Sequence, residues 1–274
     1  MDKGVFTEYA GFAPKCLLYS SVPGATHGEI DATDALKVSC NYFFYWLGHL
    51  MTIEMLDETS KGFGLGEPTG IELVEKIGWR ANRESKKASY TGTNANWTAG
   101  DRVLAAIGQS ENRFTPLQLC VYACTLANQG TRYRATFLNR VVSSDYRELL
   151  LEGEKSVMSH MEISEEAYKA YSEGMYLVTH ATDRFNGTAY STFKDYPIDV
   201  CAKTGTAQTG NPTGSDNAAF ICYAPADDPQ IAIAIYGEKA GHGSWLATVA
   251  KSILDVYFEV GEIGDVTVNE NQPS

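Results

Sequence analysis

The segment from Ile198 to Gly210, IDVCAKTGTAQTG, constrains the fold of this chain more than any other stretch. Apolar residues at positions 198, 200 and 202 alternate with other residues, a pattern that predicts a half-buried strand. On such a strand Lys203 and Gly205 lie on one face. Thr204 and Thr206 lie on the other face, and the missing side chain of Gly205 lets a second backbone lie against the strand. The segment therefore predicts a sheet edge that binds an extended anionic peptide beside an ammonium group and two hydroxyls.

Charge and composition exclude several classes of protein. The 274 residues carry a net charge of −12, with 44% hydrophobic and 20% charged residues, which is typical of a globular protein with a sizeable core. The sequence has no basic run and no stripe of basic and aromatic residues, so nucleic acid is not an expected partner. No apolar run reaches the length that a membrane-spanning helix needs.

The six cysteines do not indicate a metal or redox site. The sequence contains no Cys-x-x-Cys pair and no set of cysteines and histidines with the spacing of a zinc site. Cys120 and Cys124 are four residues apart on an expected helix, where burial in an apolar face is the usual role of such a pair. We therefore expect neither a bound metal nor a cofactor.

Helix and strand signals along the chain predict an α+β fold. We expect helices at 31–38, 41–52, 53–60, 116–129, 165–180 and 243–259, a hairpin at 136–153, and two further strands between 217 and 237. The clearest helix has Thr115 as its N-cap, Pro116 at its first position and Gly130 at its C-terminal cap. Residues 1–30 and 75–103 are expected to be irregular.

The order of these elements indicates one domain. Three C-terminal strands follow one another between helices, which predicts an antiparallel sheet flanked by helices. We assign residues 1–260 to this domain, because no linker or repeat divides them. The polar tail at 261–274 is expected to be disordered.

Short motifs need context before they carry weight. The triplet Lys-Thr-Gly at 203–205 is rare by chance, whereas Ser-x-Asn is common and occurs three times, at 39–41, 110–112 and 215–217. The only Ser-x-x-Lys is Ser191-Thr-Phe-Lys194, which ends nine residues before Lys203. Spelling alone does not decide which of these triplets acts together with Lys203.

Longer segments supply that context. KTGTAQ, preceded by GTA and followed by AFICYAPADDPQIAIAI, is similar to the transpeptidase domain of penicillin-binding proteins. So are HGEIDATDALKVSCNYFFYWLG, FGLGEPTGIEL and the segment from Trp97 to Gly130 with its AIGQ and TPLQL elements. The agreement runs in one order over roughly residues 25–260, and it most resembles the class B, elongation type. The resemblance implies a β-lactamase/transpeptidase-like fold and motifs in the chain order SxxK, SxN and KTG.

Two of these three motifs have a place in this sequence. Ser39-Cys40-Asn41 has the neighbours of the SxN motif, whereas the triplets at Ser110 and Ser215 resemble a turn and a loop. Ser191 lies between GTA and KTG, where the family has no SxxK, and Pro197 follows it closely. We therefore expect the nucleophilic serine, its helix and the N-terminal strands of the sheet to precede Met1. The chain would then be a C-terminal fragment that is inactive alone.

The resemblance also implies roles for the catalytic residues. Ser39 would relay a proton to the leaving amine. Asn41 would hydrogen-bond the substrate amide and the lysine of the missing SxxK motif. Lys203 would supply positive potential for the developing charge. No metal takes part in this chemistry.

The three residues after Lys203 would bind substrate. The hydroxyls of Thr204 and Thr206 would hold the substrate carboxylate. The backbone N–H of Thr206 would be one of two oxyanion donors, the other being that of the missing serine. Gly205 would keep the strand flat so that the peptide can pair with it.

The function that the resemblance implies is peptidoglycan D,D-transpeptidation through a serine acyl-enzyme. The expected partners are stem peptides ending in D-Ala-D-Ala, β-lactam antibiotics and membrane proteins of cell elongation. The expected location is the outer face of the cytoplasmic membrane, with the anchor outside this chain. A D,D-carboxypeptidase, a serine β-lactamase and a non-catalytic β-lactam-sensing or scaffold domain are the alternatives.

Overall fold

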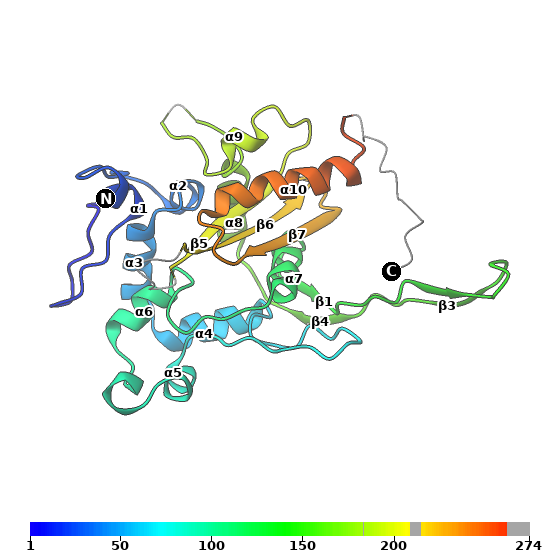
Figure 1. The fold of residues 1–274 in the computed structure, drawn as a ribbon, viewed down its shortest axis with the longest axis horizontal. Coiled ribbons are helices and arrows are strands. Elements are labelled where there is room, and N and C mark those ends of the chain that lie inside the picture. The colour runs from blue at the N-terminus through cyan, green and yellow to red at the C-terminus, as the bar shows by residue number, and fades with distance from the viewer. Residues whose placement is uncertain (183, 209–214, 262–274) are drawn as a thin grey trace, which may run out of the picture.

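A three-stranded antiparallel sheet forms the centre of the molecule in the computed structural model, which describes residues 1–182, 184–208 and 215–261 (Figure 1). The strands are β5 (Cys201–Ala207), β6 (Asn217–Ala224) and β7 (Ile231–Gly237), in the order β5-β6-β7. Within the described residues β5 pairs with β6 alone, so the predicted strand around the Lys-Thr-Gly triplet is an edge strand.

Alternating side chains place the two faces of the sheet against different helices. Phe220 and Cys222 of β6 join a core with α10 (Gly243–Tyr257). Tyr223 of the same strand joins a second core with α7 (Pro116–Ala127) and α8 (Glu165–Leu177). Figure 1 shows α10 on one side of the sheet and α7 on the other. The α+β fold with helices on an antiparallel sheet is therefore confirmed.

A second lobe carries the Ser-Cys-Asn triplet. It contains α1 (Leu17–Ser21), α2 (Ala32–Lys37), α3 (Asn41–Leu50) and α6 (Ala99–Ala105). Its core is made of buried residues from the first 103 positions, which are Phe6, Cys16, Ala35, Cys40, Tyr42, Tyr45 and Val103. Helix α2 packs along α8, so this lobe is joined to the side of the sheet.

Most of the remaining elements lie below and beside the sheet in Figure 1, and one of them, α9, lies above it. They are α4 (Ile53–Gly62), α5 (Arg83–Ser89), the 3-10 turn η1 (Gly92–Ala95), β1 (Thr131–Tyr133), β2 (Arg140–Val142), β3 (Leu149–Glu152), β4 (Val157–His160) and α9 (Tyr190–Phe193). Strands β2 and β3 form the predicted hairpin, which projects from the body, while β1 pairs with β4.

Some local predictions were wrong. Residues 75–103 hold α5, η1 and α6 rather than irregular chain. Short polar helices of this kind form because side chains close their first turns: Asn82 accepts from the amide of Ser85 at 2.8 Å, and Thr98 and Asp101 cap α6 reciprocally. At the end of α7, Gln129 takes the first left-handed position at φ 50, with Gly130 following at φ 91. Of the predicted tail at 261–274, residues 262–274 lie outside the described residues.

Candidate active site

Ser39 occupies a strained corner between α2 and α3. The Ser39 amide donates to the carbonyl of Leu36 at 3.3 Å, and the Cys40 amide donates to the carbonyl of Ala35 at 2.9 Å. These two bonds make a Schellman motif, whose left-handed position usually belongs to glycine. Ser39 stands there with φ 53, which costs a residue with a side chain on the order of 1 kcal/mol.

The corner brings Ser39 to the sheet. Lys203 Nζ donates to Ser39 Oγ at 2.8 Å, across 164 positions of sequence, and also to the carbonyl of Thr204 at 2.7 Å. Burial lowers the pKa of Lys203 from 10.5 to about 8. The serine and the lysine predicted to act together are therefore in direct contact, and the lysine can lose its proton near neutral pH.

Asn41 is the first residue of α3, one turn before Tyr45, whose hydroxyl donates to the carbonyl of Lys15 at 3.4 Å. Within the part of the chain that the structure describes, no hydrogen bond joins Asn41 to Ser39 or Lys203. Burial raises the pKa of Tyr45 to about 12, and the neighbouring Asn41 side chain offsets only part of that rise. Asn41 thus lies two residues after Ser39 in the sequence without being hydrogen-bonded to Ser39 or Lys203.

The two threonines of the strand lie on the face opposite Lys203. Ala202 is on the same face of the strand as the threonines, and it joins the core under α10. Cys201 is on the same face as Lys203, and it joins the core under α7 and α8. Thr204 Oγ1 lies 2.9 Å from Thr188 Oγ1, and Thr206 Oγ1 accepts from the amide of Gly243 at 3.4 Å. Both hydroxyls therefore already have one protein partner.

The backbone that lies against Gly205 is that of Gly243, at the start of α10. A Cβ on Gly243 would stand 2.3 Å from the Gly205 carbonyl oxygen and 2.7 Å from its nitrogen. A Cβ on Gly205 would meet only Ala219, at an ordinary 3.4 Å. The close approach that the sequence predicted at Gly205 thus requires glycine at 243, and it fixes the N-terminus of α10 beside the strand.

The competing motifs lie elsewhere. Ser191 is exposed on the single-turn helix α9, which packs against α10, and Lys194 pairs with Asp195 at the surface at 3.8 Å. Asn112 of the second Ser-x-Asn triplet bonds the carbonyl of Ala105 at 3.1 Å within its own loop. Asn217 of the third starts β6 and accepts from the amide of Lys239 at 3.0 Å. Of the three triplets, the one at 39–41 is the one bonded to Lys203.

A buried cluster that sequence reasoning missed lies directly beside Ser39. Cys40 Sγ is 3.9 Å from Cys16 Sγ and 3.6 Å from Asp2 Oδ2, and His27 Nδ1 is 2.9 Å from the same oxygen. The ligand atoms of these four buried residues all lie within 4.8 Å of one another. Spacing rules do not find the set because its members are spread from residue 2 to residue 40.

The cluster shifts the pKa values of its own members. The hydrogen bond from Cys40 lowers the pKa of the Cys16 thiol, and that contact together with burial raises the pKa of Cys40. Burial alone would lower the pKa of His27, but hydrogen bonds and charges of Cys16 and Asp2 raise it. Two thiols, an imidazole and a carboxylate are donors that tetrahedral zinc sites use, so these four residues could hold such an ion.

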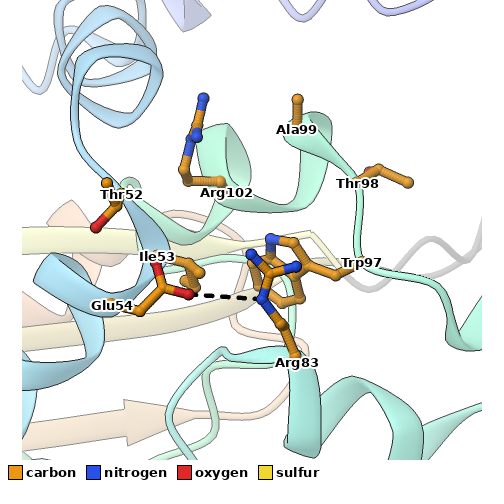
Figure 2. Close-up of a pocket in the computed structure, with 8 residues that line it drawn as sticks. All are labelled: Thr52, Ile53, Glu54, Arg83, Trp97, Thr98, Ala99 and Arg102. Carbon is orange, nitrogen blue, oxygen red and sulfur yellow. Dashed lines mark ion pairs between the residues drawn. The ribbon is translucent and has the colours of Figure 1, made fainter.

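Two hollows lie away from the Ser39–Lys203 pair. One, of about 320 Å³, is lined by residues at the start of α4 and α6, with Arg83 paired to Glu54 at 3.5 Å beside Trp97 (Figure 2). The other, of about 410 Å³, is an apolar groove between Met1 and the exposed side of α3. Neither is lined by Ser39, Lys203 or the threonines of β5, so the candidate site is identified by its side chains rather than by volume.

Comparison with known proteins identifies the family of this chain. The family model described as "Penicillin binding protein transpeptidase domain" matches residues 18–255. The chain belongs to the penicillin-binding protein transpeptidase family. It is 32% identical over 249 residues to the peptidoglycan D,D-transpeptidase MrdA of Haemophilus influenzae and 30% identical over 247 residues to MrdA of Escherichia coli K12. Each match covers 84% of this chain but only 37% of the relative.

Solved penicillin-binding proteins share the fold. The penicillin-binding protein PBP2 of Helicobacter pylori superposes with a TM-score of 0.77 at 25% identity, covering 96% of this chain and 45% of the other. A complex of PBP2 and MreC from the same organism gives a TM-score of 0.75 at 26% identity, covering 95% and 45%. The predicted transpeptidase-like fold is therefore confirmed. None of the helices that the structure describes is long and apolar enough to span a membrane.

Proposed function

We propose that this chain forms the proton-relay and carboxylate-binding half of a peptidoglycan D,D-transpeptidase cleft. The observation that carries the proposal is the 2.8 Å contact between Lys203 Nζ and Ser39 Oγ. A lysine whose pKa is about 8 can share a proton with a serine hydroxyl and so pass it to a leaving amine near neutral pH. The names of the MrdA relatives support the same reaction.

Each site residue then has a chemical task. Ser39 delivers the proton, and Lys203 supplies it while stabilising negative charge in the cleft. Thr204 and Thr206 hold the C-terminal carboxylate of the stem peptide through their hydroxyls. Asn41 bonds the substrate amide.

The backbone of the edge strand completes this half of the site. The extended substrate pairs with β5 at Gly205, where no side chain intervenes. The amide of Thr206 is one donor to the oxyanion that forms when the peptide carbonyl is attacked.

The acylated serine is not among the residues of this cleft. Ser191 begins the only Ser-x-x-Lys of the sequence. Its exposed position on α9 argues against it, since Lys203 Nζ bonds Ser39 Oγ and the Thr204 carbonyl instead. We propose that residues 1–260 are part of a transpeptidase domain whose nucleophile lies in a segment outside these 274 residues. The chain alone is then inactive, and 261–274 is a polar tail beyond the domain.

Location and partners follow from the relatives by the same proposal. One solved neighbour is PBP2 bound to MreC, and another is PBP2 of Pseudomonas aeruginosa in complex with WCK 5153. We propose that the full protein works at the outer face of the cytoplasmic membrane on stem peptides ending in D-Ala-D-Ala. There it would be acylated by β-lactams and would contact membrane proteins of cell elongation.

Labelling with a fluorescent penicillin tests the proposal. We expect the full-length protein encoded at this locus to be acylated, and the 274-residue chain not to be. In the full-length protein Lys203→Ala should slow acylation by at least 100-fold, because the proton relay and the positive charge are both lost. The matched control, Lys194→Ala, removes an exposed lysine and should leave the rate unchanged.

Two results would overturn the proposal. Labelling that maps to Ser191 would make this chain self-sufficient, and near-normal labelling of Lys203→Ala would remove that lysine from the site. Release of a D-alanine from a stem peptide without cross-linking would favour the carboxypeptidase. Rapid turnover of the penicillin would favour the β-lactamase, and acylation without any peptide reaction would favour the sensing domain.

A further inference from the structure

Thr188 touches the candidate substrate-binding strand without a role in the scheme above. It belongs to the Gly-Thr-Ala segment at 187–189, and its Oγ1 lies 2.9 Å from Thr204 Oγ1. We propose that Thr188 is a positioning residue that makes Thr204 select a carboxylate over a neutral group. The inference rests on the proposed function, because it concerns how that site recognises the end of its substrate.

The backbone around Thr188 is held tightly. A Cβ on Gly187 would stand 2.1 Å from the carbonyl oxygen of Leu177 and 2.2 Å from that of Val178, so only glycine fits against the end of α8. Ala189 is 1% exposed, and its amide donates to the Val178 carbonyl at 2.9 Å. The hydroxyl of Thr188 therefore has a fixed origin, and its β-branched side chain has few rotamers from which to choose.

The segment also reaches the Ser39 corner. The amide of Thr188 donates to the carbonyl of Lys37 at 3.3 Å, two residues before Ser39. One residue thus contacts both the α2–α3 corner through its backbone and the β5 strand through its side chain. A change in its side chain can alter Thr204 while the backbone contact with Lys37 remains.

When substrate is present, the donors and acceptors that are available fix which hydroxyl of the Thr188–Thr204 pair donates its proton. A hydroxyl has one proton to donate and two lone pairs, whereas a carboxylate can only accept. Thr204 must therefore give its own proton to the carboxylate and accept the proton of Thr188. In such a chain each O–H strengthens the next, and the gain is largest when the final acceptor carries a charge.

Thr206 has an equivalent arrangement. Its Oγ1 accepts from the amide of Gly243 at 3.4 Å, at the positive end of the fifteen-residue helix α10. Its proton is then free for the ligand, as that of Thr204 is when Thr188 donates. Thr204 and Thr206 are neighbours on one face of the strand, and their two hydroxyl protons match the two acceptor oxygens of a carboxylate. A ligand group that donates a hydrogen bond would be repelled by both hydroxyl protons.

The test compares two penicillins that differ in one charge. Second-order acylation rate constants are measured on the full-length protein with benzylpenicillin and with its methyl ester. We expect Thr188→Val to lower the rate about tenfold with the acid and less than twofold with the ester, so that the preference for the acid falls. Thr188→Ser keeps the hydroxyl and should restore most of that preference.

Thr179→Val is the matched control. Thr179 is also buried, and its hydroxyl donates to the carbonyl of Val200 at 2.8 Å just before the same strand. Losing that bond should change the rates with both penicillins by the same factor. If Thr188→Val does not fold, Thr188→Ala is used in its place, since it removes the hydroxyl without placing a methyl group against Thr204.

The outcomes separate this inference from the function on which it rests. Equal losses with both penicillins in the Thr188 variants, or no loss with either, would overturn the role of Thr188 and leave the transpeptidase assignment intact. A wild-type full-length protein that benzylpenicillin does not acylate would overturn the proposed function, and this inference with it. A selective loss with the acid alone, restored by serine, supports both.

Discussion

The two sides of the candidate site are built in opposite ways. On one side, all seven residues of β5 pair with β6, so Lys203 and its neighbours stand on a regular ladder. On the other, Ser39 has a left-handed backbone between two helices. Cys40, next to it, rests on Asp2, Cys16 and His27, which belong to the mostly irregular first thirty residues.

The two sides therefore differ in whether neighbouring or distant residues stabilise them. The strand is stabilised by pairing and by alternation within a few residues, and the corner is stabilised by buried polar contacts with a distant segment. We expect the corner to be the more fragile side, because one lost partner in a buried polar cluster leaves several groups unsatisfied. Four predictions test that contrast, beginning with the largest effect.

Removing Asp2 should disrupt the corner most. Its carboxylate accepts from the amides of Gly4 at 2.7 Å and His27 at 2.8 Å, and from the His27 ring and Cys40. Asp2→Ala leaves these donors buried without a partner, so the free energy of unfolding in urea should fall by about 3–5 kcal/mol. Asp145→Ala, at an exposed carboxylate of the hairpin, should change it by no more than about 0.5 kcal/mol. A loss below 1 kcal/mol for Asp2→Ala would mean that the corner does not depend on the N-terminal segment.

The pH dependence of the free energy of unfolding should show the titration of Lys203, which lies on strand β5. Its pKa is about 8 in the folded chain and 10.5 when unfolded. The folded state therefore binds fewer protons between these values, and stability gains up to about 3 kcal/mol as pH rises through that window. Below pH 8 the lysine is charged in both states, and the burial penalty is present in full.

Other groups titrate in the same range, so the measurement is a difference. Urea unfolding at several pH values between 7 and 10.5 compares the wild-type chain with Lys203→Met. The wild type should gain stability relative to the variant as pH rises. Parallel profiles would show that Lys203 is not desolvated in the folded state.

Zinc should stabilise the corner if its four donors act as ligands. At a free Zn²⁺ concentration of 100 times the dissociation constant, the free energy of unfolding should rise by about 2.7 kcal/mol. Cys16→Ala should abolish this gain, whereas Cys120→Ala, on α7 under the sheet, should keep it. An equal gain in both variants would indicate binding elsewhere.

The smallest effect isolates backbone strain at Ser39. Ser39→Gly and Ser39→Ala both lose the hydroxyl, but only glycine adopts φ 53 without cost. The glycine variant should be more stable than the alanine variant by about 1 kcal/mol in thermal unfolding. At Ser172, inside α8, the order should reverse, because alanine is the better helix former. Equal stability at position 39 would remove strain from the description of this corner.

Much of the local structure was predictable. The helices expected at 31–38, 116–129 and 165–180 are present as α2, α7 and α8. The side chains of their N-caps, Asp31, Thr115 and Ser164, each accept from an amide in the first turn. The three strands and the hairpin followed from alternation and turn residues. The failures at residues 75–103 arose because short polar helices depend on capping side chains, which a search for apolar periodicity does not detect.

The candidate site was predictable only in part. Lys203, Thr204 and Thr206 stand out because a strand pattern places them on known faces, and Ser39 stands out through its neighbours. Thr188 and the cluster of Asp2, Cys16, His27 and Cys40 carry no spacing signal. The side-chain contacts within the cluster, and that of Thr188 with Thr204, join positions 11 to 38 residues apart.

The sequence by itself determined the secondary structure around the triplets, the faces of β5 and the membership of the transpeptidase family. Those properties are encoded within a few residues, by alternation, capping and motif order. Only the tertiary structure decided that the triplet at 39–41 meets Lys203, that Gly243 rather than Gly205 must lack a side chain, and that Thr188 bonds Thr204. Contacts of this kind depend on how separate elements pack, and packing is a property of the folded core rather than of any single segment.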